Sequence, residues 1–581
     1  MDSAELTELI RVARGLSPAN AWIRNAAVLN VYTGEVSEAH VVVSGKRIAY
    51  VGDRDPMVDE RTVVLDAAGQ TLVPGYFEPH AHSCLMYNPQ TFAAYSVARG
   101  TTAVLQDNMP FFLNLEQTEM ERVFEVLSRL PVKSYWWCRL DPQMGNSDEM
   151  KKFTPDRIRR TMDHPSVLQA GELTGWKMLF DLDPGMVERV AIARASGKRI
   201  ETHNPGASIH TLNVMAAGGA TACHESISAE DVWARVRLGY YAALRHSSIR
   251  PDLPHLIRGL LDTGFTAWDR LMFTTDGASP FFLSAGTLDL CVSIAIEQGL
   301  PPAAAYRMAS LNPAIYYGLD ADLGGIAPGR IADILFLEDL RHPTPRRVMV
   351  DGHIVAEDGQ LTVPQPSVDW AALGVRSLAV TDRAVKPDWF DVQAGPDGNV
   401  PVIELRNAVI TRLVEEPLPV QDGRVVLADC PGCLYAAVID RMGAWGTTAV
   451  LRGFGDFDAV ASSHALTGDF VVVGRNQTEM ARALQRVIEI GGGICLRNQG
   501  DCVFEMAMPM FQTMSLEPMD ALMDAARRFD EQMRAFGYAH EDPVYTLLFL
   551  SATHLPAVRL TERGLYEVKT DRVLAPARSL S

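Results

Sequence analysis

The sequence is poor in cysteine, and its cysteines lack the framework spacing of a disulfide-stabilised secreted domain. Eight cysteines are scattered through 581 residues, which is typical of a protein kept in a reducing cytoplasm. The N-terminus has no basic stretch followed by an apolar segment, so we expect no secretory signal. There is also no uninterrupted apolar run of the ~18 residues that a membrane span requires. We therefore expect a cytoplasmic protein without a membrane partner.

Positive charge is also in deficit. The chain has 53 lysine and arginine residues against 71 aspartate and glutamate residues, a net charge of −18. Such a charge argues against nucleic acid as the main partner. The 47% of hydrophobic and 21% of charged residues are those of a globular protein, and the length allows about two to four domains. We expect a small-molecule substrate and a homo-oligomer, either a dimer or a tetramer.

What the chain does have is a pair of histidines, His80 and His82, at the end of the stretch Pro74–His82. Strand-type residues lead into this stretch. Because side chains two residues apart on a strand point to the same face, both imidazoles can reach one divalent cation. Two solvent-facing histidines at a strand end are the alternative, since short motifs often occur by chance.

Strand-like and helix-like segments alternate from about residue 76 to residue 319, a pattern typical of parallel βα architecture. The expected strands are Val73–His80, Thr102–Gln106, Val132–Arg139, Val167–Glu172, Lys198–His203, Ala220–His224, Tyr240–Arg245 and Leu271–Thr275. Eight strands in a stretch of this length predict a (β/α)8 TIM-type barrel, which typically takes about 250 residues.

Two further parts flank the predicted barrel, residues 74–319. Residues 1–73 and 320–365 are both β-rich, and we expect them to assemble into one small composite β-sandwich domain. A proline-containing linker follows at Val363–Ser367. Residues 375–581 then begin a new series of strands and helices, which predicts a separate C-terminal α+β domain.

Metal-capable side chains recur at the carboxyl ends of the predicted barrel strands, where the active sites of such barrels lie. They are His80, His82, Asp107, Glu172, His203, His224, His246 and Asp276. Each alone has an ordinary structural explanation, such as a turn or a helix cap, but together they predict a metal site. Imidazole and carboxylate ligands suit Zn, Mn or Fe, and four histidines with two acids can hold two metals about 3.5–4 Å apart.

Such a centre would use a bridging hydroxide to attack a carbonyl or amidine carbon. Asp276 is placed to bind a metal and shuttle a proton, and Glu225, next to His224, is a candidate for protonating a leaving amine. We assign catalytic roles to Asp276, Glu225 and His224. The predicted substrate pocket consists of Ser83, Cys84, Asp107, Asn108, His246 and Ser247.

These motifs resemble the adenine deaminases of the amidohydrolase superfamily. Besides Pro74–His82, the similar segments of the barrel are Gly171-Glu172, Thr202–Gly206, Cys223–Glu225, Asp269–Asp276, Arg307–Pro313 and Ile326–Asp333. Further similar segments near the C-terminus are Ala461–Ser463, Val472–Gly474, Ile488–Gly493 and Leu560–Leu565. The resemblance implies hydrolysis of adenine to hypoxanthine and ammonia by two divalent ions, Mn²⁺ or otherwise Fe²⁺ or Zn²⁺. The implied ligands are His80, His82, Glu172 as the bridge, His203, His224 and Asp276.

The chain departs from the family pattern around the substrate. Apolar or weakly polar residues, Cys84, Leu85, Met86 and Met109, replace polar family residues. An alternative hypothesis follows from this: the enzyme hydrolyses a more apolar cyclic or linear amide, and adenine is a poor substrate. A catalytically silent binding subunit is a third hypothesis, which the complete set of metal-capable residues argues against.

Overall fold

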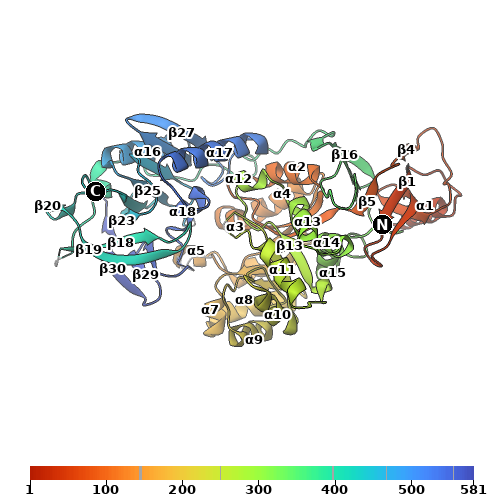
Figure 1. Ribbon diagram of the computed structural model, residues 1–581, viewed down its shortest axis with the longest axis horizontal. Coiled ribbons are helices and arrows are strands. Elements are labelled where there is room, and N and C mark those ends of the chain that lie inside the picture. The colour runs from red at the N-terminus through yellow and green to blue at the C-terminus, as the bar shows by residue number, and fades with distance from the viewer. Residues whose placement is uncertain (143–146, 249, 396–397, 466, 554, 581) are drawn as a thin grey trace.

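A computed structural model describes residues 1–142, 147–248, 250–395, 398–465, 467–553 and 555–580. Three parts lie in a row (Figure 1): a β-rich part with the N-terminus at one end, a barrel in the middle and a C-terminal part at the other end. We propose that they correspond to three domains, residues 1–73 with 320–365, residues 74–319 and residues 375–581. None of the helices described is long and apolar enough to cross a membrane.

The central part is a barrel of parallel strands that hydrogen-bond to one another in chain order. The strands are β6 (Tyr76–Ala81), β7 (Thr101–Asp107), β8 (Lys133–Cys138), β9 (Val167–Leu173), β10 (Arg199–Thr202), β11 (Ala222–Cys223), β12 (Tyr241–Arg245) and β13 (Leu271–Thr274). A parallel bridge between Ala81 and Asp276 joins the first strand to the last. The predicted (β/α)8 architecture is therefore confirmed.

Helices surround the barrel and bury their apolar faces against it. They are α2 (Pro89–Ala98), α3 (Met109–Asn114), α4 (Gln117–Leu127), α5 (Ser147–Met150), α6 (Pro155–Asp163), α7 (Trp176–Phe180), α8 (Pro184–Ala195), α9 (Ile209–Gly218), α10 (Ala229–Arg237), α11 (Leu253–Asp262), α12 (Pro280–Leu283), α13 (Leu288–Glu297), α14 (Pro302–Ala309) and α15 (Leu311–Tyr317). Helix α4 illustrates why they pack: Met120, Val123, Phe124 and Leu127 are buried and recur every three or four residues.

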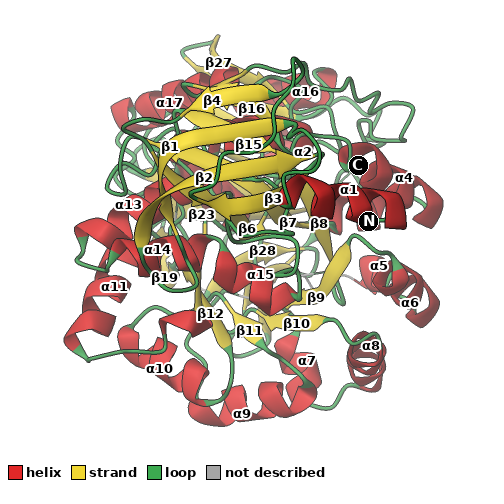
Figure 2. Cartoon of the chain, turned by 90° about the vertical axis from the view of Figure 1, so that its right-hand side faces the viewer, coloured by secondary structure: helices red, strands yellow, loops and turns green. Residues whose placement is uncertain are grey.

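The small β-rich part draws its strands from both sides of the barrel sequence, as expected. One sheet contains β1 (Ala21–Leu29), β2 (Val36–Ser44), β3 (Arg47–Gly52), β4 (Val63–Asp66), β5 (Thr71–Pro74), β14 (Ile334–Leu337), β15 (Arg347–Val350), β16 (His353–Glu357) and β17 (Gln360–Leu361). Figure 2 shows this sheet face-on, with helix α1 (Ser3–Ala13) beside it. Hydrogen bonds connect all nine strands, and strands β5 and β14 pair across the two sequence segments.

The chain passes from the small sheet to the barrel at Gly75, so the expected strand Val73–His80 is divided between β5 and β6. A Cβ atom at Gly75 would lie 2.2 Å from Oγ1 of Thr102. Since no side chain fits there, the backbone of the crossing point lies directly against strand β7.

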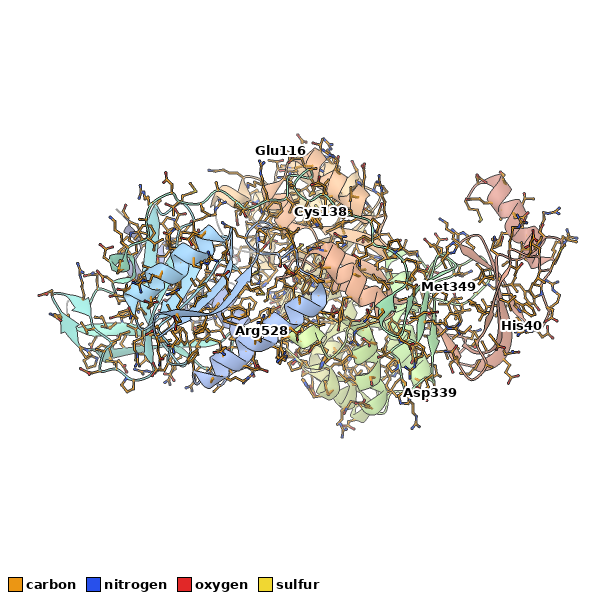
Figure 3. The ribbon with its side chains drawn as sticks, turned by 90° about the horizontal axis from the view of Figure 1, so that it is seen from above. His40, Glu116, Cys138, Asp339, Met349 and Arg528 are labelled. Carbon is orange, nitrogen blue, oxygen red and sulfur yellow. The ribbon has the colours of Figure 1, made fainter. Side chains whose placement is uncertain are left out.

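The C-terminal part contains a second nine-stranded sheet with helices packed on it. Its elements are β18 (Asn399–Leu405), β19 (Thr411–Pro417), β22 (Cys433–Ile439), β23 (Trp445–Arg452), β24 (Ala459–Ser462), β25 (Phe470–Gly474), β26 (Gly493–Asn498), β27 (Asp501–Ala507), β31 (Arg578–Ser579), α16 (Gln477–Glu489), α17 (Met519–Ala535) and α18 (Pro543–Phe549). Shorter strands are β20 (Val420–Gln421), β21 (Arg424–Val425), β28 (Val558–Thr561), β29 (Gly564–Glu567) and β30 (Arg572–Pro576). Helix α17, which carries the labelled Arg528, lies where this part meets the barrel helices α2 and α12 (Figure 3).

Candidate active site

Metal-capable side chains gather at the carboxyl ends of the barrel strands. Among the residues that the structure describes, three overlapping groups could hold an ion: His80, Glu172 and His224; His80, His82 and Asp276; and His203, His224 and Glu225. The six ligands expected from the sequence all belong to these groups. Glu225, which we expected only as an acid or base, belongs to the third group as well.

Glu172, at the end of β9, lies between the two halves of the cluster. Its Oε2 atom is 2.9 Å from Nδ1 of His203 and 3.2 Å from Nε2 of His224. Its Oε1 atom is 3.5 Å from Nε2 of His82. The two carboxylate oxygens therefore face different histidines, as a bridging ligand must.

Asp276 completes the half of the cluster that contains the first two histidines. Its Oδ1 atom lies 3.5 Å from Nε2 of His80 and 3.2 Å from Nε2 of His82. The backbone of Asp276 has φ of +50°, a conformation that residues with a side chain seldom adopt. Hydrogen bonds hold it there, since its amide donates to Oγ1 of Thr274.

Glycine at position 171 allows Glu172 to take its place. Gly171 has φ of +102°, and a Cβ atom there would lie 2.3 Å from the carbonyl oxygen of Glu201. The close approach of strands β9 and β10 at this point leaves no space for a side chain.

Carboxylates behind the cluster fix the orientation of the histidine rings. The two oxygens of Glu201 lie 2.8 Å from Nδ1 of His80 and 3.0 Å from Nδ1 of His224, and Asp107 lies 3.0 Å from Nδ1 of His82. In each ring this leaves Nε2 facing the centre, an arrangement found around metal-binding histidines. Asp107, which we expected in the substrate pocket, therefore also contacts a histidine of the cluster.

Glu201 is the partner that orients two histidines at once, and we expect Glu201→Gln to weaken metal binding by about 10–100-fold. The amide cannot accept hydrogen bonds from both rings with the strength of a carboxylate. Metal content after dialysis against a graded series of chelator concentrations measures the change. The exposed Glu230→Gln serves as the control and should leave metal affinity unaltered; equal affinities in the two variants would contradict this role.

Two buried arginines hold the carboxylates of the cluster from outside. Arg139, which is fully buried, donates from Nη2 to Glu172 Oε1 at 2.9 Å and also contacts Asp107. Arg245 donates from Nη1 to Asp276 Oδ2 at 2.5 Å and lies 2.7 Å from Glu225 Oε1. Neither arginine was expected as a site residue, because their partners come from neighbouring strands.

These contacts set the charge states of the acids. Burial opposes ionisation of Glu225, but Arg245 and other nearby cations lower its pKa to about 2. Burial likewise opposes ionisation of Asp276, and Arg245 with the histidines keeps its pKa well below the usual value. Burial disfavours a charged His82, yet its contacts with Asp107 and Asp276 raise its pKa to about 10. The centre therefore favours positive charge among its histidines and ionised acids around them.

A cavity of about 870 Å³ opens above the cluster, and His82, Glu172, His203, Glu225, Arg245 and Asp276 line its inner end. Of the expected pocket residues, Cys84, Asp107 and Ser247 line it. The other three lie outside the lining. The hydroxyl of Ser83 donates to Gln106, Asn108 is buried against Met120, and His246 packs on the ring of Phe282.

Lys177 lies away from the centre. Superfamily members that bridge their metals with a modified lysine would need such a residue at the cluster, but Lys177 is 75% exposed on α7 and pairs with Asp181. Of Lys177 and Glu172, only Glu172 lies among the histidines of the cluster.

Comparisons with known proteins agree with this geometry. The amidohydrolase family model matches residues 71–355, and the adenine deaminase C-terminal domain model matches residues 408–572. A Halalkalibacterium halodurans protein named "Putative adenine deaminase" is 37% identical over 576 residues, 99% of this chain and 98% of its own length. The chain belongs to the adenine deaminase family. A Moorella thermoacetica member named "Adenine deaminase" is 32% identical, with 97% of each chain covered.

Membership identifies the chain as an amidohydrolase, a hydrolase of carbon–nitrogen bonds outside peptides, in a family that generally uses divalent metal. The adenine deaminase family match extends into the C-terminal part, beyond the barrel. The cluster of metal-capable side chains lies within the segment that the amidohydrolase model covers. The cavity residues, except Leu378 and Asn407, lie within the two segments that the family models cover together.

Proposed function

We propose that the chain hydrolyses adenine to hypoxanthine and ammonia at a centre of two divalent metals. The observation that carries the proposal is Glu172, whose two oxygens face His82 on one side and His203 and His224 on the other. Relatives of nearly the same length that carry the adenine deaminase name support the choice of substrate. A more apolar amide as the substrate is not favoured, because those relatives match over the whole chain.

The residues present fit two metal ions. The cluster has five buried carboxylates, Asp107, Glu172, Glu201, Glu225 and Asp276, but three guanidinium groups, those of Arg139, Arg245 and Arg250. A metal-binding imidazole must be neutral, and with neutral histidines two negative charges are left over. Buried charge without a partner is costly, and divalent ions would supply that partner. Nε2 of His80 is buried without a hydrogen-bond partner among the described residues.

We assign one metal position to His80, His82 and Asp276 and the other to His203 and His224, with Glu172 shared. Mn²⁺ is the proposed ion, with Fe²⁺ or Zn²⁺ as substitutes that the same donors accept. Ions bound there would acidify a water molecule and polarise the ring carbon under attack.

The protein's acids supply the proton steps. The water oxygen becomes the C6 carbonyl and loses both of its protons, of which one ends on N1 of hypoxanthine and the other on the departing ammonia. Asp276 is ionised and faces the centre through Oδ1, so it accepts the proton of the attacking water. Glu225 is held ionised between Arg245 and Arg250, so it accepts the second proton, from the hydroxyl group formed on C6, and passes it to the departing amine. Asp276 passes the first proton to N1.

The test is a substrate panel with the manganese-loaded protein: adenine, guanine, cytosine and cyclic amides, with products identified by chromatography. We expect hypoxanthine and ammonia from adenine with kcat/KM of about 10⁴ M⁻¹s⁻¹ or more, the ordinary range of enzymes. Turnover of a cyclic amide without turnover of adenine would overturn the proposal. The predicted homo-oligomeric state and cytoplasmic location stay predictions.

A further inference from the structure

The C-terminal part forms a wall of the cavity opposite the metal cluster. Asn407, Trp445, His464, Phe511, Tyr545 and Leu548 line the cavity from this side. The barrel alone therefore leaves the substrate site incomplete, and any ring bound above the cluster lies between barrel loops and C-terminal side chains.

Tyr545 on helix α18 reaches the end of this cavity where His82 and Asp276 lie. An ideal Cβ atom built on Gly277, the residue after Asp276, would lie 3.0 Å from the Tyr545 hydroxyl oxygen and 3.6 Å from Cδ2 of His82. Leu85, which also lines the cavity, approaches the same point. The absence of a side chain at Gly277 thus leaves the space into which the tyrosine hydroxyl reaches.

The hydroxyl of Tyr545 is buried and has no hydrogen-bond partner among the residues that the structure describes. The side chain is held in place by its ring, which stacks on Phe549 with 5.5 Å between centroids. By contrast, the equally buried Tyr538 of the same part bonds Thr546 at 2.7 Å. Buried polar groups almost always have a hydrogen-bond partner, and leaving one without a partner is costly. The Tyr545 hydroxyl is therefore placed to hydrogen-bond a molecule bound in the cavity.

We propose that Tyr545 donates a hydrogen bond to a ring nitrogen of the substrate and so determines specificity from the C-terminal part. This inference rests on the proposed function. In adenine N1, N3 and N7 are acceptors, whereas N9 carries a hydrogen. N3 and N7 remain acceptors in hypoxanthine, and a phenol donates to either of them without a change of charge. Contact with Tyr545 would hold the ring while its C6 atom faces Asp276.

The experiment compares Tyr545→Phe with the wild type, and with Tyr538→Phe as a matched control. Tyr545→Phe removes the donor but no hydrogen bond among the residues that the structure describes, so melting temperature and metal content should stay the same. We expect the affinity for the product hypoxanthine, measured by calorimetry, to fall about tenfold and KM for adenine to rise by a similar factor. Tyr538→Phe should lower the melting temperature and leave both constants unchanged.

Discrimination between adenine and its deaza analogues is a second measurement. A purely structural role of Tyr545 would leave this discrimination unchanged in Tyr545→Phe. Wild type should discriminate against the one analogue that lacks the bonded nitrogen, and Tyr545→Phe should lose that discrimination. If wild type turns over adenine and Tyr545→Phe keeps its affinity and KM within twofold, the inference is overturned while the proposed function stands. If wild type has no turnover of adenine, the proposed function fails and this inference fails with it.

Discussion

Replacing Glu172 with alanine is expected to remove both metal ions from the protein and to lower kcat/KM for adenine by about 10⁴-fold or more. Its two oxygens face different histidines, so one substitution takes a ligand from both metal positions at once. It also leaves the buried guanidinium of Arg139 without one of its two partners. Elemental analysis of the purified variant and steady-state kinetics measure the two effects.

Lys177→Ala is the control for this substitution. Lys177 is close to Glu172 in the chain but exposed on α7, where it pairs with Asp181. We expect full metal content and unchanged turnover. The assignment of the bridge would be wrong if the alanine at 177 lost metal, or if the alanine at 172 kept two ions.

The second large effect is expected for Asp276→Asn, which should lower kcat by about 10²–10⁴-fold, the range for loss of a general acid or base. Asparagine has nearly the same shape and keeps an oxygen that can face the centre, but it cannot take up the proton of the attacking water. The bond from Arg245 to Oδ2 also loses its ionic partner. KM should change much less than kcat.

Asp269→Asn provides the comparison, because Asp269 precedes strand β13 and Asp276 follows it. The two residues lie at opposite ends of one strand. Asp269→Asn should therefore keep the kcat of the wild type. Metal content is determined alongside the rates. Turnover by Asp276→Asn within tenfold of wild type would exclude this residue from the proton transfer.

The barrel and the clustering of the metal-capable side chains were predictable because both follow from local sequence patterns. Strand periodicity placed the eight strands within a few residues, and parallel strands bring their carboxyl ends to one edge. His80, Glu172, His203, His224 and Asp276 all lie at that edge. The expected strand Val73–His80 was divided at Gly75, since an apolar run of this kind does not show where it leaves one sheet for another.

The supporting residues were not predictable, because they act through neighbours that are distant in the chain. Arg139 is a site residue only because strand β8 lies between β7, which carries Asp107, and β9, which carries Glu172. Glu201 lies on β10, and His203 directly follows that strand two residues later, a spacing that could have signalled Glu201. Tyr545 reaches the cavity from another part of the fold, and no pattern within its own helix points to adenine.

The account is tested most directly by titrating metal-depleted protein with Mn²⁺ while following hypoxanthine formation from adenine. We predict no turnover without metal, and activity that rises until two ions are bound per chain, with tyrosine and tryptophan fluorescence showing a folded protein throughout. Full activity in the metal-free protein, or a folded protein with two bound ions and no hypoxanthine, would contradict the account.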